Sequence, residues 1–170
     1  MDAAQVLELI KTRRSVRRFS DQPVSPEMIG AVLEAGSWAP SGTNNQPWRF
    51  VVVSDPALKQ ELAPLTKYGS VIKGAAILIC TFIHCPSMYN ETKDHQSVGA
   101  CLENMLLMAH GLGLGAVWLG EILKSAGQVR QVLGVSGEHE LMAVVCLGHP
   151  AGGSKEPSRK PLDELVLERR

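Results

Sequence analysis

Hydrophobic positions along the chain recur at two spacings, one typical of helices and the other of strands. Apolar residues at Val6, Leu7 and Ile10 follow the helical period and predict an amphipathic helix over 3–12. Short apolar or β-branched runs instead predict strands. These predicted strands cover residues 48–53, 75–83, 116–119 and 141–147.

The remaining helices are marked by signals at their ends. Ser25-Pro26-Glu27 combines a capping serine, a proline suited to the first helical position and an early acid, so it predicts a helix start. Asp55-Pro56 opens a shorter helix that should end near Lys67. A long apolar helix is predicted over 96–112 and another over 126–133, because glycines follow both segments.

Polar, irregular segments separate these elements, notably residues 84–94 and the Gly/Pro/Lys-rich stretch 148–161. Helices and strands mix without strict β-α-β alternation or a glycine-rich first turn, which argues against a dinucleotide-binding fold. The order predicts an α+β sandwich with helices on a mixed sheet. The helix over 96–112 is apolar nearly all round, so we expect it to pack against a partner subunit as well.

Composition places the chain among ordinary globular proteins. Its 170 residues are 45% hydrophobic, which fits one domain spanning residues 1–170. Lys+Arg and Asp+Glu both count 17, so the zero net charge argues against broad attraction to nucleic acid or anionic membrane. The longest apolar run is too short for a bilayer, and the N-terminal charges follow the apolar stretch, unlike a signal peptide. We expect a cytoplasmic protein with no nucleic-acid or membrane partner.

Several catalytic and metal-binding classes lack their motifs in this sequence. Cys80, Cys85, Cys101 and Cys146 form no C-x-x-C pair and no zinc spacing, so we expect free, structural thiols in a reducing compartment. The histidines show no H-E-x-x-H spacing. A G-x-S-x-G elbow and a Walker loop are also missing. We therefore expect no metal site.

A basic cluster follows the first helix. Arg13, Arg14, Arg17 and Arg18 fall within six residues, and Ser15 lies among them. Guanidinium groups match the geometry of phosphate, and a serine adds a hydroxyl donor, so this cluster is a candidate anion site. Because runs of charge are often simply solvated, an exposed basic surface is the alternative.

The loop Pro40–Trp48 is a second unusual segment, with small residues and side-chain amides between two prolines. Gly42 permits close approach of the backbone to a ligand. Asn44, Asn45 and Gln46 can both donate and accept hydrogen bonds, which suits a heteroaromatic edge such as the flavin pyrimidine. An ordinary turn is the alternative, since these residue types favour turns.

Two further segments are candidates for ligand contacts. The glycine-rich stretch 111–120 follows a helix rather than opening one, so it fails the context of a dinucleotide fingerprint. It is either a helix cap with a tight turn or a segment that presents backbone N–H groups to a planar ligand. Arg159 is either a second basic point of an anion site or part of an exposed tail.

Four stretches in chain order, RRSVRRF, APSGTNNQPWRFVVV, GACLENMLLMAHGLGLGAVWLGE and SRKPLDELV, together resemble the nitroreductase family of FMN enzymes in its short form. The resemblance runs from about residue 8 to 167. It implies an α+β sandwich with a mixed, mainly antiparallel sheet flanked by helices. It also implies an intertwined homodimer with FMN at the interface, bound tightly but not covalently, and NAD(P)H as co-substrate.

The resemblance also assigns the cofactor-binding residues. Those implied at the phosphate and ribityl chain are Arg13, Arg14, Ser15, Arg17 and Arg159. Those implied at the isoalloxazine, from the other subunit, belong to the loop and are Pro40, Ser41, Gly42, Asn44 and Gln46. Leu119 and Gly120 match the segment whose backbone N–H points at flavin N5.

The sequence departs from the family pattern at two points. Many members carry a second basic residue where this chain has Pro157, and Lys155 is a candidate substitute. Many also place a lysine near flavin N1, a role open here to Lys67 or Lys73. The segment that covers the substrate must be small and should lie within residues 62–94.

The implied activity is ping-pong transfer of reducing equivalents from NAD(P)H to nitroaromatic, quinone or similar electrophilic acceptors. No side chain need act as nucleophile or general acid, because the flavin carries the chemistry. Three other flavin chemistries of the family stay open: dehalogenation, dehydrogenation and flavin breakdown. A non-catalytic flavin-binding or redox-sensing module is the alternative outside enzymes.

Overall fold

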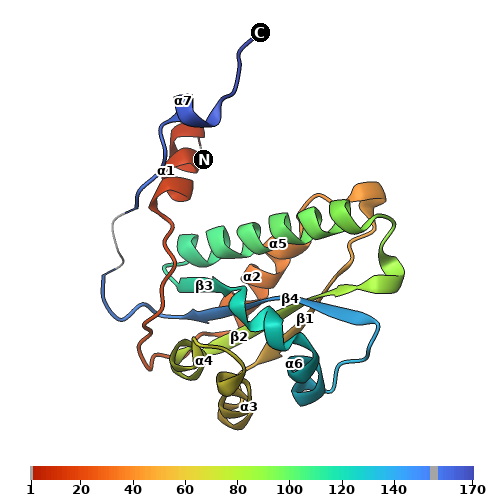
Figure 1. Ribbon diagram of the computed structural model, residues 1–170. Helices are drawn as coiled ribbons and strands as arrows, with labels where there is room; N and C mark the ends of the chain where they lie inside the picture. The colour runs from red at the N-terminus through yellow and green to blue at the C-terminus, as the bar shows by residue number, and fades with distance from the viewer. Residues whose placement is uncertain (1, 154–156) are drawn as a thin grey trace.

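The computed structural model describes residues 2–153 and 157–170, and a four-stranded sheet of order β1-β2-β4-β3 forms its centre (Figure 1). The strands are β1 (Trp48–Val53), β2 (Ile77–His84), β3 (Gly115–Leu119) and β4 (His139–Gly148). All three ladders in the described residues are antiparallel, so the expectation of a mainly antiparallel sheet is confirmed, whereas the expectation that the sheet is mixed is wrong for these strands. One isolated parallel bridge, between Ser15 and Ala116, lies outside the ladders.

Helices cover both faces of this sheet, as the sandwich prediction requires (Figure 1). They are α1 (Ala3–Thr12), α2 (Pro26–Ser37), α3 (Pro56–Leu62), α4 (Gly69–Gly74), α5 (Glu91–Gly111), α6 (Ala126–Leu133) and α7 (Leu162–Leu165). The predicted capping residue at the start of α2 and the predicted glycine at the end of α6 are confirmed. The Ser25 side chain accepts the Met28 N–H and caps α2, while Gly134 ends α6 in the left-handed region at φ 63°.

Strand β2 shows why its sequence is apolar without a break. Ile77, Ile79 and Ile83 pack with α2 and α5 on one face of the sheet. Leu78 and Phe82, between them, pack with α3, α4 and α6 on the other face. Because successive side chains of a strand point to opposite faces, a strand covered on both sides loses the apolar–polar alternation.

The start of α5 corrects the sequence prediction. The helix begins at Glu91, not at residue 96, so much of the segment 84–94 is ordered rather than irregular. Asn90 caps the helix, because its side chain accepts the N–H of Lys93 at 3.1 Å. The first turns are polar, so the apolar period that marks the rest of the helix is missing there.

The region between β1 and β2 also differs from the prediction of one helix ending near Lys67. Helix α3 stops at Leu62, a short turn follows, and α4 forms separately. Pro64 within this turn has no N–H to continue a helix. A Cβ on Gly69 would lie 2.5 Å from the carbonyl oxygen of Ala63, so the tight return depends on glycine.

Helix α1 stands apart from the core and has no buried residue. Its apolar side chains Val6, Leu7 and Ile10 are 42%, 50% and 46% exposed. In Figure 1, α1 and the unpredicted α7 project away from the sheet and the helices around it. The C-terminal end of α1 nevertheless touches α5, through a hydrogen bond of 2.9 Å between Thr12 Oγ1 and His110 Nε2.

Candidate functional site

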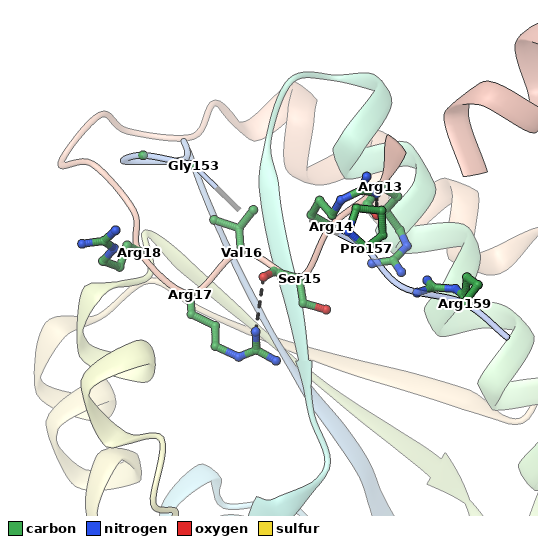
Figure 2. A pocket seen from close by; sticks show the side chains of 10 residues that line it. Arg13, Arg14, Ser15, Val16, Arg17, Arg18, Gly153, Pro157 and Arg159 are labelled. Carbon is green, nitrogen blue, oxygen red and sulfur yellow. Dashed lines mark hydrogen bonds between the residues drawn. The ribbon is translucent and has the colours of Figure 1, made fainter. Parts of the chain in front are cut away.

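A cavity of about 450 Å³ lies where the chain leaves α1, within the usual size range of small-molecule sites. We call it the arginine cavity. Its lining residues are Arg13, Arg14, Ser15, Val16, Arg17, Arg18, Gly152, Gly153, Pro157 and Arg159. Figure 2 shows Arg13 and Arg14 beside Pro157 and Arg159, so the two ends of the chain form one wall.

Strand β3 fixes one side of this segment. Ser15 forms the parallel bridge with Ala116, and the Val16 N–H donates to the Ala116 carbonyl at 2.9 Å. A Cβ on Gly115 would lie 2.7 Å from Cγ1 of Val16. The glycine at the start of β3 is therefore needed for the basic segment to lie against the sheet.

The segment that follows β4 holds the other side. The Ser20 N–H donates to the His149 carbonyl at 2.8 Å, and the Ala151 N–H donates to the Arg18 carbonyl at 3.0 Å. Gly152 follows at φ 117°, a region that favours glycine. These contacts bring Gly152 and Gly153 to the cavity. Lys155, the candidate substitute for a second basic residue, lies outside the described residues.

The charge of the cavity is strongly positive. Five arginines line it, and no carboxylate does among the residues that the structure describes. Arg14, Arg17 and Arg159 donate to main-chain carbonyls, which leaves most of their N–H groups without an acidic partner. Nε of Arg13 is buried without a hydrogen bond, although it lies 3.5 Å from Oε1 of Glu103. A bound anion would supply the missing acceptors.

The positive charge of the cavity also affects the pKa of His110. Burial lowers the pKa of His110, and the charges of Arg13 and Arg14 lower it further. The imidazole is therefore neutral at pH 7, and it can complete its hydrogen bond with Thr12 without adding another cation next to the cavity.

Three of the predicted loop residues, Pro40, Ser41 and Gly42, lie elsewhere, at a second hollow of about 370 Å³ that we call the loop hollow. It is lined by Pro40, Ser41, Gly42, Tyr89, Lys93, Gln96, Ser97 and Ala100. It shares no residue with the arginine cavity. Lys93 at the hollow and Glu103 beside Arg13 are ten residues apart on α5 (93 to 103), or about 15 Å along the axis. One chain thus keeps the two groups of predicted residues separate.

The loop itself has an unusual backbone. Thr43, Asn44 and Gln46 have φ of 54°, 58° and 44°, in the left-handed region that non-glycine residues rarely adopt. Side chains of Asn44 and Gln46 are exposed and do not line the hollow. The ring of Tyr89 lies against Gly42 and would clash with any Cβ there, so this glycine allows the contact.

Leu119 is the last residue of β3 and Gly120 follows it, and neither residue lines the arginine cavity or the loop hollow. Gly120 is four residues beyond Ala116 (116 to 120), or about 13 Å along a strand from the arginine cavity. The next residue, Glu121, accepts the N–H of Lys67 at 3.0 Å. Lys67 is thereby linked to the Gly120 end of β3, whereas Lys73 lies in the last turn of α4.

Glu121 forms a junction that the sequence does not reveal. Its carboxylate pairs with Lys124 and accepts the hydroxyl of Thr66 at 2.6 Å. These partners, Lys124 first, lower the pKa of Glu121 to about 2. The ionised carboxylate therefore ties the segment before α4 to the turn after β3.

Comparison with known proteins identifies the family. The family model described as "Nitroreductase family" matches residues 10–76 and 66–149. The chain belongs to the nitroreductase family. A Methanothermobacter thermautotrophicus protein, provisionally named an NADH dehydrogenase/NAD(P)H nitroreductase, is 35% identical over 174 aligned residues, with 96% of this chain and 87% of the relative covered.

Solved structures agree with this nitroreductase-family assignment. A crystal structure of a provisionally named nitroreductase from Desulfovibrio desulfuricans, in complex with FMN, is 48% identical, with a TM-score of 0.92 and coverage of 97% of this chain and 96% of that one. The NADPH:FMN oxidoreductase of Vibrio harveyi, complexed with NAD⁺, is 28% identical, with a TM-score of 0.88 and coverage of 96% and 76%. The predicted family and enzyme class are confirmed.

Not every lining residue of this nitroreductase-family chain is predictable from sequence. Arg18 belongs to the predicted basic cluster, but the family resemblance does not assign it to the cofactor. Gly152 lines the cavity with a positive φ, which the sequence does not indicate. Tyr89 and Lys93 fall in the segment expected to be irregular. The spacing of polar residues in the segment 84–94 does not indicate that Tyr89 and Lys93 line a hollow together with the Pro40 loop.

The remaining predictions concern thiols and membranes. Cys80, Cys101 and Cys146 are buried and free, whereas Cys85 is free but exposed on the turn after β2. Burial raises the pKa of Cys80 and of Cys101 to about 12. Among the described helices, none is long and apolar enough to cross a membrane. The described residues also contain no group of three potential metal ligands.

Proposed function

We propose that this chain is a single-domain, FMN-dependent NAD(P)H oxidoreductase that acts as a homodimer. The observation that carries the proposal is the arginine cavity, which collects five guanidinium groups and no lining carboxylate among the described residues. Such a cavity suits a phosphate group, because guanidinium groups bind phosphate through paired hydrogen bonds. The FMN bound to the Desulfovibrio desulfuricans relative supports the choice of ligand.

The residues at hand fit FMN in shape as well as charge. Arg13, Arg14, Arg17 and Arg159 would hold the phosphate, together with the Ser15 hydroxyl. Strand β3 leads from this point toward Gly120, about 13 Å away, so an elongated ligand along the strand would bring its ring to the end of β3. Hydrogen bonds and charge interactions between these side chains and the FMN phosphate would be non-covalent. The five arginines that line the cavity support tight binding of FMN.

A second copy of the chain would complete the site. The loop that carries Pro40, Ser41, Gly42, Asn44 and Gln46 lies at the loop hollow, which shares no residue with the arginine cavity of the same chain. Exposed apolar side chains on α1 and a third, mainly apolar hollow of about 420 Å³ lined by residues such as Leu107 and Met108 support self-association. We infer a two-fold dimer in which each loop faces the flavin of the partner subunit.

When bound, FMN supplies hydride and electron transfer between NAD(P)H and an acceptor. The protein would position the reactants. The arginines would neutralise and anchor the phosphate, and the Gly120 N–H would orient N5. Lys67, whose main-chain N–H is held by Glu121 beyond Gly120, would be the candidate to supply positive charge near the pyrimidine ring. We propose that NAD(P)H and a nitroaromatic, quinone or similar acceptor occupy the same face in turn, which gives ping-pong kinetics without a catalytic side chain.

The proposal is tested first by colour and cofactor content. Purified protein should be yellow and should release FMN on denaturation, and stopped-flow mixing with NADH or NADPH should bleach the flavin. Reoxidation is then followed with a panel of quinones, nitroaromatics and halogenated aromatics. Colourless protein that cannot be reconstituted with FMN would overturn the proposal. Binding of FMN without multiple turnover would instead favour a flavin-binding or redox-sensing module.

The cellular location follows from the same chemistry. Three of the four cysteines are buried and free, and a flavin enzyme that uses NAD(P)H needs a compartment that supplies this reductant. We infer a cytoplasmic protein. Fractionation of cells that produce it should recover the NAD(P)H-oxidising activity with cytoplasmic marker enzymes, and recovery in another fraction would contradict the inference.

A further inference from the structure

Asp94 is a fully buried carboxylate in the first turns of α5, at 0% exposure. Both oxygens of the Asp94 carboxylate accept hydrogen bonds. Oδ1 accepts from the Asn45 side chain at 2.6 Å, and Oδ2 accepts the main-chain N–H groups of Tyr89 at 3.0 Å and Asn90 at 2.9 Å. Burial acts to raise the pKa of Asp94, but the hydrogen bonds from Asn90, Asn45 and Tyr89 outweigh it and hold the pKa below its usual range.

Asn45 connects this carboxylate to the loop that carries Ser41 and Gly42. Its side-chain nitrogen donates to Asp94 and, at 3.0 Å, to the Ser87 carbonyl. Within the described part of the chain, these are the two hydrogen bonds that tie residues 41–45 to a distant segment. The others close the loop on itself, as in the bond from the Gln46 N–H to Ser41 Oγ at 3.1 Å.

The loop needs this external support because its backbone is strained. Thr43, Asn44 and Gln46 are left-handed without being glycine, and such residues relax when the surrounding structure does not hold them. Asn45 lies between two of them. An ionised acceptor makes a stronger hydrogen bond than a neutral one, so an aspartate is well suited to hold the Asn45 amide.

The same carboxylate holds the facing wall of the loop hollow. Through Oδ2 it fixes the main chain of Tyr89, and the Tyr89 ring lies against Gly42. One buried group therefore sets the position of the loop and of the aromatic side chain that packs on it. Neither contact involves the arginine cavity.

We propose that Asp94 is a positioning residue, which acts through Asn45 and Tyr89 to hold the strained Ser41–Gln46 loop in the conformation that faces the flavin and the acceptor. The inference rests on the proposed function in one respect, since the flavin is the group that the loop would meet. The conformation of the loop itself can be measured with or without cofactor.

The test compares Asp94→Asn, Asn45→Ala and the double variant with the wild type. Glu91→Gln is the matched control, because Glu91 is an exposed acid on the same helical turn. Hydrogen exchange is measured at the amides of Asn44 and Gln46, first in FMN-free protein. FMN affinity and the flavin absorption bands are then measured in reconstituted dimers.

We expect faster exchange in the loop for both single variants, with the amides of β2 unchanged. FMN affinity should fall about tenfold, equivalent to ~1.4 kcal/mol, with a shifted flavin band. The double variant should lose no more affinity than Asp94→Asn alone, because the two residues act as one link. Glu91→Gln should match the wild type in every measurement.

Three experimental outcomes test the positioning role of Asp94. Unchanged loop exchange in Asn45→Ala, the milder variant, would overturn the proposal. So would uniformly faster exchange across the sheet with an unshifted flavin band, because that pattern indicates general destabilisation. If the wild type fails to bind FMN, the proposed function fails, yet selective loop exchange in the two variants would still support the positioning role of Asp94.

Discussion

Replacement of Arg13 by glutamine separates binding of the phosphate from binding of the flavin ring. The Arg13 side chain is 17% exposed and points into the arginine cavity, where its Nε lacks a hydrogen bond. Glutamine keeps a polar side chain of similar reach but removes the charge. The ion pair with Glu103 is also lost, and the Glu103 side chain is 45% exposed, so water can solvate it.

The expected magnitude follows from these contacts. A hydrogen bond to a charged group contributes about 1.5–3 kcal/mol, which corresponds to roughly 10- to 150-fold in the dissociation constant of FMN. The half-exposed pair with Glu103 should contribute no more than about 1 kcal/mol to folding. Affinity for FMN should therefore fall far more than stability.

Titration of flavin fluorescence at fixed ionic strength measures the effect, with FMN and riboflavin as paired ligands. Riboflavin lacks the phosphate, so Arg13→Gln should weaken FMN binding while riboflavin binding stays the same. Arg130→Gln is the control, because Arg130 lies on α6 and does not line the cavity. Equal losses for both ligands, or no loss for FMN, would refute the assignment of this cavity to the phosphate.

Three further predictions concern neighbouring contacts. Gly115→Ala places a Cβ 2.7 Å from Val16, so we expect about 1–3 kcal/mol lower stability in urea unfolding and weaker FMN binding; wild-type values would contradict the close approach. His110, followed by NMR, should titrate below pH 6.5 without ligand, and its pKa should rise when phosphate offsets the charge of Arg13; an unmoved pKa would argue against an anion there. Glu121 has a lowered pKa of about 2, so its contribution to stability is present above about pH 4.5 and is lost as the pH falls toward 2. Glu121→Gln should lack that part of the acid dependence of the urea midpoint, and an identical pH profile would disprove the role.

Elements with strong local signals were predictable. Strand β1 spans residues 48–53 as expected, because a β-branched run between turn residues has few alternatives. The start of α5 was missed because its first turns owe their stability to Asn90 and Asp94, which are side-chain caps rather than an apolar period. The α3–α4 break depends on close packing of Gly69 on Ala63, a contact that local sequence does not encode.

The candidate site likewise has a part that the sequence predicts and a part that it does not. The arginines were found because residue type alone suits an anion, and the structure gathers Arg13, Arg14, Arg17 and Arg159 around one cavity. The link from Asp94 to Asn45 joins residues 49 positions apart, and the link from Thr66 to Glu121 joins residues 55 apart. Such pairs arise from the tertiary fold, so neither periodicity nor composition points to them.

The exposed position of α1 has a consequence for how the protein is built. A ten-residue helix is marginal by itself in water, and α1 has no buried residue to stabilise it. If a second copy covers Val6, Leu7 and Ile10, then completion of this helix and association of the two chains are one cooperative step. The segment that enters the arginine cavity directly follows α1, so dilution should lower helix content and loosen cofactor retention together.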